Sequence, residues 1–322
     1  MAVNQIQRLL AHLDSQVLGQ QQLTQSILIG LLADGHLLVE GPPGLAKTRA
    51  VNSLSDGIDA NFHRVQFTPD LLPADLTGTD IYRPETGEFI FQKGPLFHNL
   101  ILADEINRAP AKVQAALLEA MAERQITVGG TTYPLPELFL VMATQNPLEQ
   151  EGTYPLPEAQ LDRFLMHVEI DYPDADTELK ILQLTRGESI DELAGKLPNS
   201  VEKLSQSDIK QARKSVLEVH LSSAIENYIV QLVVATRRPQ LYSEELASFI
   251  DIGVSPRATI ALERCARAHA WLNNREFVSP DDVQAVLNNV LRHRIILSYQ
   301  AQAKGITSNQ VIDQIKQLVP VP

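Results

Sequence analysis

Residues 37–48 read LLVEGPPGLAKT, and this stretch decides the fold of the first half of the chain. A short apolar run, typical of a buried strand, leads into a Pro/Gly loop, and a Lys-Thr pair then opens a helix. This order is the P-loop arrangement, in which backbone N–H groups and a helix N-terminus hold phosphate groups. We expect Lys47 to reach the β- and γ-phosphates of ATP and the Thr48 hydroxyl to hold Mg²⁺.

One position of this loop departs from the usual P-loop pattern. Ala46 stands where the second glycine belongs. Alanine is the mildest replacement for glycine, and it is tolerated if the backbone at that residue has a negative φ. The sequence therefore predicts a nucleotide site with a negative φ at Ala46. The expected binding residues of this loop are Gly41, Pro42, Pro43, Gly44, Leu45, Ala46, Lys47, Thr48 and Arg49.

The composition limits the class of protein to which this chain can belong. Its 322 residues suffice for two domains, and its formal charge of 27 − 39 = −12 disfavours a surface that coats nucleic acid. The one cysteine, Cys265, excludes an intrachain disulfide, which is typical of a reducing compartment. No signal-peptide pattern opens the sequence, and no apolar run reaches the length of a membrane span. We therefore expect a cytoplasmic protein without membrane insertion.

Strand and helix patterns alternate through the first half of the chain. Short apolar or alternating runs predict strands at residues 62–67, 100–103, 139–143 and 167–170, and helical patterns lie at residues 47–58 and 111–124. Such alternation predicts an α/β fold with a mostly parallel sheet covered by helices. Residues 81–91 and 125–133 read as two hairpins, with turns at Pro-Glu-Thr-Gly and Gly-Gly.

The pattern changes near residue 172. Beyond it strand-like runs vanish, and helical patterns occupy residues 177–185, 209–217, 224–236, 257–272 and 281–291. We therefore expect an α/β domain at residues 1–172 and a small all-helical domain at residues 173–322. The last dozen residues are expected to be loosely held.

Two acids follow the apolar run at residues 100–103. At the end of a buried strand, Asp104 can coordinate Mg²⁺, and Glu105 can orient and polarise an attacking water. Asn146 ends the next buried strand and can touch both the γ-phosphate and the water. The alternatives are a polar strand end for the two acids and a turn-forming Asn before Pro147. Their positions after a P-loop in an α/β domain favour the catalytic interpretation.

Two arginines are candidates for contacts with the phosphates. Arg163 could be an arginine finger supplied to the ATP of a neighbouring subunit, and Arg257, which opens a helix, could sense the γ-phosphate. Each could instead form a surface ion pair, which is the usual role of an arginine. On chemistry alone both interpretations stay open.

Five ordered motifs give the chain a resemblance to the MoxR family of AAA+ ATPases over nearly its whole length. They are GPPGLAKT at residues 41–48, LADEINRA at residues 102–109, ATQNP at residues 143–147, EAQLDRF at residues 158–164 and SPR at residues 255–257. The resemblance implies ATPase activity and an AAA+ fold, a three-layer αβα sandwich followed by a helical lid. The implied roles are Walker A for Lys47 and Thr48, Walker B for Asp104 and Glu105, sensor 1 for Asn146, arginine finger for Arg163 and sensor 2 for Arg257.

The same resemblance assigns further segments. Val17, Leu18 and Gly19 are similar to the segment that lines the adenine pocket. The two hairpins are similar to the helix-2 insert (residues 79–94) and the pre-sensor-1 insert (residues 125–133) of this clade. Such proteins resemble hexameric ring machines that remodel client proteins, often with a partner that bears a von Willebrand factor A domain. They are linked to the maturation or metal-cofactor loading of other complexes.

These observations together predict an ATP-hydrolysing, oligomeric AAA+ remodeller of protein complexes. A metal-chelatase motor subunit has a similar motif set and stays an alternative. A DNA-translocating motor would need basic hairpins, yet the first hairpin carries only Arg83 and Lys93, and residues 125–133 carry no basic residue. A nucleotide-gated scaffold without hydrolysis is disfavoured by the intact Asp104-Glu105 pair.

Overall fold

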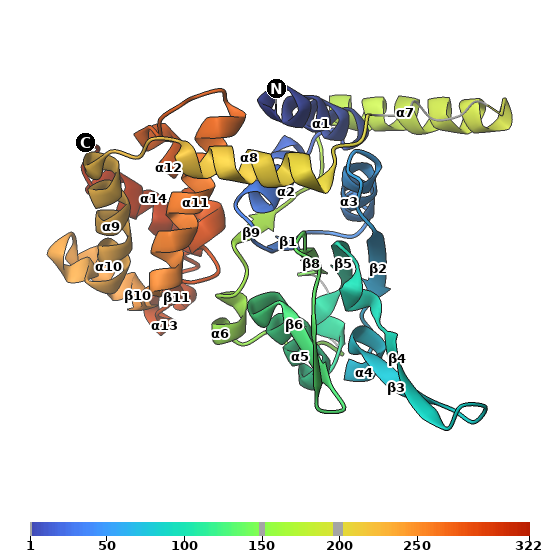
Figure 1. Ribbon diagram of the computed structural model, residues 1–322. Helices are drawn as coiled ribbons and strands as arrows, with labels where there is room; N and C mark the ends of the chain where they lie inside the picture. The colour runs from blue at the N-terminus through green and yellow to red at the C-terminus, as the bar shows by residue number, and fades with distance from the viewer. Residues whose placement is uncertain (1, 148–151, 196–201) are drawn as a thin grey trace. The chain divides into compact units, whose positions relative to one another are not determined.

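The computed structural model describes residues 2–147, 152–195 and 202–322 (Figure 1). The contacts within the chain divide it into two units. Unit 1 comprises Met1–Leu28, Val39–Tyr154 and Val168–Ile209, and unit 2 comprises Ile29–Leu38, Pro155–His167 and Lys210–Pro322. These units are not continuous in sequence, so the division into residues 1–172 and 173–322 stays a prediction.

The first part of the chain alternates strands with helices, as predicted. Its elements are α1 (Ala2–Gln16), α2 (Gln21–Leu32), β1 (Leu37–Glu40), α3 (Lys47–Asp56), β2 (Phe62–Gln66), α4 (Pro73–Thr77), β3 (Gly78–Arg83), β4 (Glu88–Lys93), η1 (Pro95–Phe97), β5 (Leu100–Asp104), η2 (Ile106–Arg108), α5 (Ala111–Glu123), β6 (Gln125–Val128), β7 (Thr131–Pro134), β8 (Leu140–Gln145), α6 (Glu158–Leu161), β9 (Met166–Glu169) and α7 (Ala175–Leu193).

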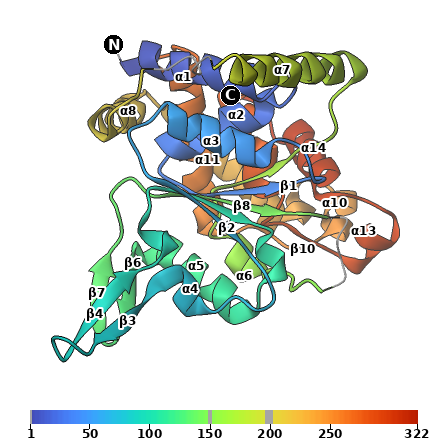
Figure 2. The ribbon, with the colours of Figure 1, turned by 90° about the vertical axis from the view of Figure 1, so that its right-hand side faces the viewer.

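The central sheet has the strand order β2-β5-β8-β1-β9, and β5 pairs in parallel with both β2 and β8. The apolar residues of β5 and β8 are buried, and the last residue of each strand is polar and only partly buried. Figure 2 shows α1 and α3 on one side of the sheet and α5 on the other. The predicted αβα sandwich is confirmed, and its parallel strands bring their carboxyl ends to one edge.

The two predicted hairpins are confirmed as β3–β4 and β6–β7, both antiparallel. The β3–β4 hairpin extends well beyond the sheet (Figure 1), and nearly all of its residues are exposed. Near its base Phe91 stacks on Tyr133 of β7, with ring centroids 4.2 Å apart. The two hairpins are therefore joined through an aromatic contact.

Helices dominate the second part of the chain. Its elements are α8 (Gln206–Glu218), α9 (Ser223–Arg237), η3 (Pro239–Leu241), α10 (Glu244–Phe249), β10 (Ile250–Ile252), α11 (Pro256–Leu272), α12 (Pro280–Leu291), β11 (Ile296–Leu297), α13 (Tyr299–Ala303) and α14 (Ser308–Leu318).

Within unit 2, α11 packs against α9 and α12, and α12 packs against α14. Side-chain caps start several of these helices: Ser255 accepts a hydrogen bond from the Arg257 N–H at the start of α11. The short antiparallel pair β10–β11 adds two strands that the sequence analysis does not predict. The prediction of a loosely held C-terminus is wrong, because Val311, Ile312 and Ile315 of α14 are fully buried. Across the described part of the chain, no helix combines the length and the apolar character needed to cross a membrane.

Candidate functional site

The P-loop connects the end of β1 to the start of α3 through two left-handed residues. Gly44 has φ +84°, and Ala46 has φ +55° and caps the N-terminus of α3. The predicted negative φ at Ala46 is therefore wrong. A residue with a Cβ costs about 1–2 kcal/mol in this conformation, and the Ala46 carbonyl still accepts the first helical bond, from the Ala50 N–H at 2.9 Å.

Gly41 sits where no side chain fits, since a Cβ there would lie 2.5 Å from both the carbonyl oxygen and Cγ1 of Ile170. From α3, the Lys47 ammonium returns to this point and donates to the Gly41 carbonyl at 2.6 Å. Burial lowers the pKa of Lys47, and the nearby carboxylates of Asp104, Glu105 and Glu40 oppose that shift. The ammonium is thus partly dehydrated and surrounded by acids, which suits it to an anionic ligand such as a phosphate.

One hydroxyl orients both acids at the end of β5. Thr144, buried in the neighbouring strand β8, donates to Asp104 Oδ1 at 2.6 Å and accepts from the Glu105 N–H at 3.0 Å. Glu105 has φ +58°, so its backbone is held in the left-handed region at this hydrogen bond. Non-glycine residues in that region concentrate at functional sites, where the surrounding structure enforces them.

Side chains from β2 and η2 hold the same two carboxylates. Gln66 donates to Glu105 Oε2 at 2.8 Å, and Arg108 Nε lies 3.0 Å from the same oxygen. Arg64 pairs with Asp104 Oδ2 through its Nη2 at 2.6 Å and its Nε at 3.1 Å. The two carboxylates therefore bond to different side chains, and this separation does not come from alternation along β5, because the strand ends at Asp104 and Glu105 has a left-handed backbone.

The remaining predicted residues fall into two groups. Asn146 directly follows β8 and is buried in unit 1, next to Gln145, whose carbonyl lies 3.5 Å from Lys47 Nζ. Arg163 and Arg257 belong to unit 2, where Arg163 is exposed in the turn after α6 and Arg257 begins α11. Arg257 Nη1 lies 3.5 Å from Asp162 Oδ2, so the segments of the two arginines meet at one carboxylate.

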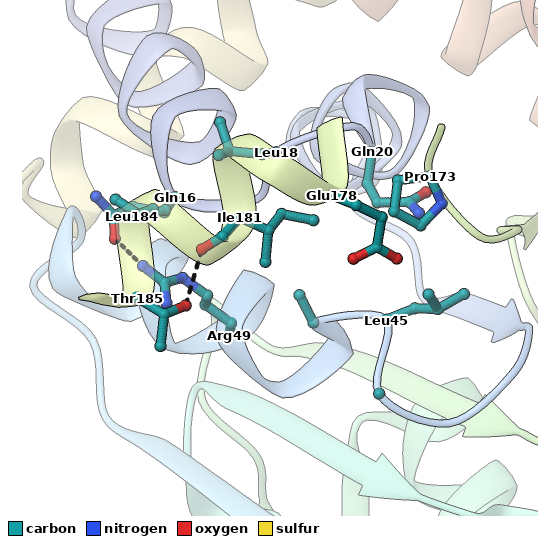
Figure 3. Close-up of a pocket in the computed structure, with 12 residues that line it drawn as sticks. Gln16, Leu18, Gln20, Leu45, Arg49, Pro173, Glu178, Ile181, Leu184 and Thr185 are labelled. Carbon is teal, nitrogen blue, oxygen red and sulfur yellow. Dashed lines mark hydrogen bonds between the residues drawn. The ribbon is translucent and has the colours of Figure 1, made fainter. Parts of the chain in front are cut away.

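A pocket of unit 1 adjoins the P-loop and has a volume of about 130 Å³ (Figure 3). The end of α1, the P-loop and α7 line it, with Leu18, Leu45 and Ile181 among its apolar residues. Gly19, at φ +80°, packs so closely on α7 that a Cβ would lie 2.6 Å from Thr177 Cγ2. Arg49 closes one side by donating to Gln16 Oε1 at 2.9 Å and by pairing with Glu188. The pocket therefore offers apolar walls to a flat ring beside the phosphate loop.

Val17 is not among the residues that line this pocket, and it is buried, with 1% of its surface exposed.

Several side chains that contact the predicted residues are absent from the sequence prediction. They are Arg64, Gln66, Arg108 and Thr144 in unit 1, and Asp162 and Arg294 in unit 2. Thr144 carried a usable signal, because a threonine at the end of an otherwise apolar buried run needs a hydrogen-bond partner. Arg64 and Gln66 lie two residues apart on β2, so their side chains share one face of the strand. Both lie beside β5 once the two strands are known to pair. Arg294 carried none, since its partner Asp162 lies 132 residues away in sequence.

Comparisons with known proteins agree with this geometry. Residues 36–166 match the model of the ATPase family associated with various cellular activities (AAA), and residues 243–315 match that of the AAA lid domain. Chaperone MoxR1 of Mycobacterium tuberculosis is 43% identical over 99% of this chain and 83% of that protein, and Protein MoxR of Paracoccus denitrificans is 34% identical over 97% and 95%. A crystal structure of a Cytophaga hutchinsonii protein has a TM-score of 0.91 at 48% identity, covering 100% of this chain and 96% of that one. The chain therefore belongs to the MoxR family of AAA+ proteins and is an ATPase.

Proposed function

We propose that this ATPase assembles into a ring, a hexamer in the form we favour, and uses ATP hydrolysis to remodel or mature client protein complexes. Its family membership supports the chaperone-like character of that work. The hairpins of unit 1 supply the argument for direct contact with a client. The proposed client offers a protein segment with apolar or aromatic side chains.

The exposed tip of the β3–β4 hairpin is the observation that carries the client proposal. Phe89 is 70% exposed and Tyr82 is 51% exposed, and their rings pair across the hairpin with centroids 5.2 Å apart. Aromatic rings are enriched at the centres of protein contacts, where they bury large areas at low cost in side-chain entropy. This tip is therefore suited to hold an apolar segment of another protein.

The hairpins are also attached to the elements that carry the acid pair. η1 and β5 directly follow β4, and β6 directly follows α5. Phe97 of η1 contacts both Phe91 and Tyr133, with ring centroids at 5.7 and 6.5 Å. A shift of β5 or α5 during the nucleotide cycle would therefore move both hairpins together, which is how hydrolysis would act on a client.

In the proposed reaction the side chains of unit 1 hold the nucleotide and the water. Lys47 neutralises the β- and γ-phosphates, Glu105 polarises the attacking water, and Asn146 orients it. Mg²⁺ fits the oxygen donors of Thr48 and Asp104, because it binds proteins through one or two carboxylates and takes its remaining ligands from phosphate and water. Bound Mg²⁺ would add positive charge on the phosphate oxygens.

Two arginines and the apolar pocket complete the proposed site. Arg163 is proposed to reach the ATP of a neighbouring subunit as an arginine finger, which suits its exposed position. Arg257 is proposed to sense the γ-phosphate. The pocket lined by Leu18 is proposed to hold the adenine ring, and Val17 and Gly19 flank Leu18 in the same segment.

The proposal extends to partners and location. A protein that bears a von Willebrand factor A domain is the partner we expect, and the cytoplasm is the expected location. The absence of any intrachain disulfide, since the sequence has one cysteine, agrees with a reducing compartment.

The client proposal is tested with a variant that retains ATP. Proteins that remain bound to the Glu105→Gln variant in ATP are captured and quantified, with and without the additional substitutions Tyr82→Ala and Phe89→Ala. We expect the captured clients to fall about tenfold without the two aromatic side chains, because a buried aromatic anchor contributes at least 1–2 kcal/mol to binding. Tyr299→Ala is the matched control, since Tyr299 is an aromatic side chain of unit 2 that is 86% exposed. Unchanged capture after the hairpin substitutions would contradict the proposal.

Two other results would favour the alternative functions. ATPase activity that DNA stimulates in a salt-sensitive way would support a DNA-translocating motor. Capture of a metal-inserting partner subunit would support a chelatase motor.

A further inference from the structure

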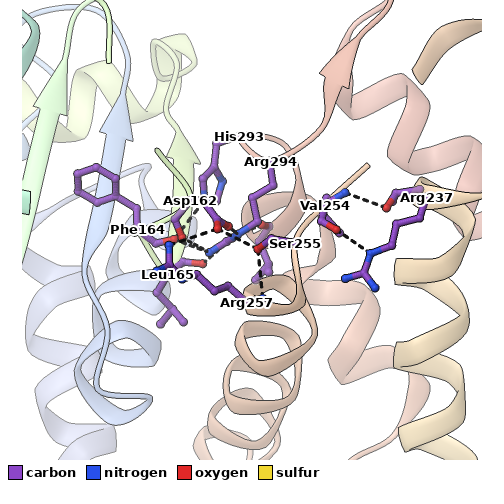
Figure 4. Close-up of polar contacts among 11 residues, drawn as sticks. Asp162, Phe164, Leu165, Arg237, Val254, Ser255, Arg257, His293 and Arg294 are labelled. Atoms are coloured by element: carbon purple, nitrogen blue, oxygen red, sulfur yellow. Dashed lines mark hydrogen bonds and ion pairs between the residues drawn. The ribbon is translucent and has the colours of Figure 1, made fainter. Parts of the chain in front are cut away.

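Arg294 is a buried arginine that follows α12 and has a side chain only 3% exposed (Figure 4). Its Nε donates to Asp162 Oδ1 at 2.8 Å, and its Nη2 donates to the carbonyls of Asp162 and Phe164 at 3.3 and 2.6 Å. Its Nη1 donates to the carbonyl of Leu165 at 3.2 Å and to that of Val290. All five N–H groups of the guanidinium are therefore used, four of them on residues 162–165.

These contacts surround Arg163. The N–H groups of Arg163 and Phe164 bond to carbonyls of the preceding turn at 3.1 and 3.0 Å, whereas the carbonyls on either side of Arg163 turn toward Arg294. His293 adds a contact from its Nε2 to the Phe164 carbonyl at 3.2 Å. The first tie of this segment to the sheet region is the bond from the Leu165 N–H to the His36 carbonyl at 2.8 Å, just before β9 begins at Met166. The carbonyls of Asp162 and Phe164, on either side of Arg163, are instead fixed by side chains from the end of α12.

The Asp162 carboxylate extends the same network to Arg257. Its Oδ2 accepts from the Ser255 hydroxyl at 2.8 Å and lies 3.5 Å from Arg257 Nη1. Ser255 in turn caps α11 by accepting from the Arg257 N–H at 3.2 Å. One carboxylate therefore touches the turn of Arg163, the cap of the helix that Arg257 begins, and Arg257 itself.

The energetics favour a permanent contact between Arg294 and Asp162 and an exchangeable contact between Arg257 and Asp162. Burial lowers the pKa of Arg294, and the hydrogen bond and charge of Asp162 oppose that shift. A buried guanidinium is stable only while its donors are paired, so Arg294 should stay on Asp162. Arg257 is 58% exposed, and its contact is long, so a phosphate can replace Asp162 as its partner at little cost.

We propose that Arg294 and Asp162 are positioning residues of the ATPase: Arg294 fixes the turn that presents Arg163, and Asp162 links that turn to Arg257. This inference rests on the proposed roles of Arg163 and Arg257. In this proposal the Asp162 carboxylate couples the two arginines. Arg163 serves the ATP of the neighbouring subunit, and Arg257 senses a γ-phosphate. Release of Arg257 toward phosphate would leave Asp162 held by Arg294 and Ser255.

The test uses rings mixed from two subunits. The acceptor subunit carries Arg163→Ala and keeps an intact acid pair, and the donor subunit carries Glu105→Gln and keeps Arg163. Neither hydrolyses ATP well alone, and the mixture should recover activity because donor arginines serve acceptor sites. Arg294→Lys is then added to one subunit at a time, since lysine keeps the charge beside Asp162 but cannot bond all of the carbonyls.

We expect Arg294→Lys in the donor subunit to lower the recovered kcat about tenfold or more, with KM for ATP changed less than threefold. A displacement of about 1 Å at a reacting group can cost a hundredfold in rate. In the acceptor subunit, whose position 163 is already alanine, the same substitution should have a much smaller effect. Equal losses in the two placements, or no loss in either, would overturn the positioning role. A mixture that recovers no activity before Arg294 is changed would overturn the trans role of Arg163, and this inference with it.

A second variant covers the case in which Arg294→Lys fails to assemble. Asp162→Asn keeps the size of the side chain and its contact with Ser255, but it removes the charge that Arg294 and Arg257 share. Placed in the donor subunit, it should again lower the recovered kcat more than it does in the acceptor subunit. Thermal melting and ring size, measured for each variant, show whether the subunits still fold and assemble.

Discussion

The acid pair of unit 1 and the arginine turn of unit 2 (residues 162–165) both place charged side chains at an end of a strand or helix, and they are held in different ways. Asp104 and Glu105 end a central strand, between two parallel neighbours that supply Gln66 and Thr144. The arginine turn is bonded to the residue before β1 only at its end, where the Leu165 N–H donates to the His36 carbonyl at 2.8 Å, and its carbonyls depend on Arg294 and His293.

The difference shows what fixes the position of each charged group. The backbone at a strand end is held by the hydrogen bonds of the whole sheet, so loss of one side chain removes a contact without moving the backbone far. A turn whose carbonyls are held mainly by one buried guanidinium depends on the few bonds of that group, so a single substitution can displace it. We therefore expect chemistry-specific losses at the acid pair and positional losses at the arginine turn.

The largest effect should come from Glu105→Gln. The amide cannot accept a proton from water, so we expect kcat to fall about 10³-fold, within the range for loss of a general base. Binding of a fluorescent ATP analogue should persist, because Lys47 and the P-loop remain. Glu123→Gln, which alters an exposed glutamate at the end of α5, is the control. Unchanged turnover in the Glu105 variant would show that Glu105 does not act on the attacking water.

A smaller loss should follow from Thr144→Val, which keeps the shape of the side chain and removes its hydroxyl. The Glu105 N–H and Asp104 Oδ1 would each lose a partner, so we expect kcat to fall about 10- to 100-fold, as for loss of a group that orients a metal-binding carboxylate. KM for ATP should change less. Thr144→Ser restores the hydroxyl and should restore most of the rate. If serine and valine behave alike, the hydroxyl does not orient the acids.

The smallest effect should be a pH dependence of the arginine turn. Burial holds the pKa of His293 well below its usual value, and the charges of Arg294 and Arg292, with His167, act in the same direction. The unfolded chain therefore binds more protons than the folded chain below about pH 6.5, so stability should be complete above that pH and fall as the pH drops through it. Thermal melting from pH 8 to 5 should show a steeper fall for the wild type than for His293→Gln. Equal slopes would mean that His293 does not contribute.

Local patterns predicted most of the sheet and the acid pair, for a physical reason. A buried parallel strand must be apolar along its length, so the run at residues 100–103 locates both β5 and the polar residues that end it. The register with β2 and β8 then follows from the sheet, which is why predicted residues from three separate motifs meet in unit 1. The roles assigned to these residues remain predictions.

Other features depend on information that a local pattern does not hold. The left-handed backbone of Ala46 follows from how the loop must meet α3, and its residue type suggested the opposite. Arg294 resembles any other basic residue after a helix until the fold brings Asp162 to it. The final helix was within reach, however, because Thr307 and Gln310 form a capping box ahead of its apolar residues.

The base of the β3–β4 hairpin is closed by two glycines that tolerate no side chain. A Cβ at Gly78 would strike the Gln92 carbonyl, and one at Gly94 would strike the Leu76 carbonyl. Everything between these two points lies outside the ladder that aligns Gln66 with Asp104. The hairpin touches the rest of unit 1 through Phe91, which packs on Phe97 and Tyr133. We therefore expect that its length beyond Phe91 can change while the pairing of β2 with β5 stays as it is.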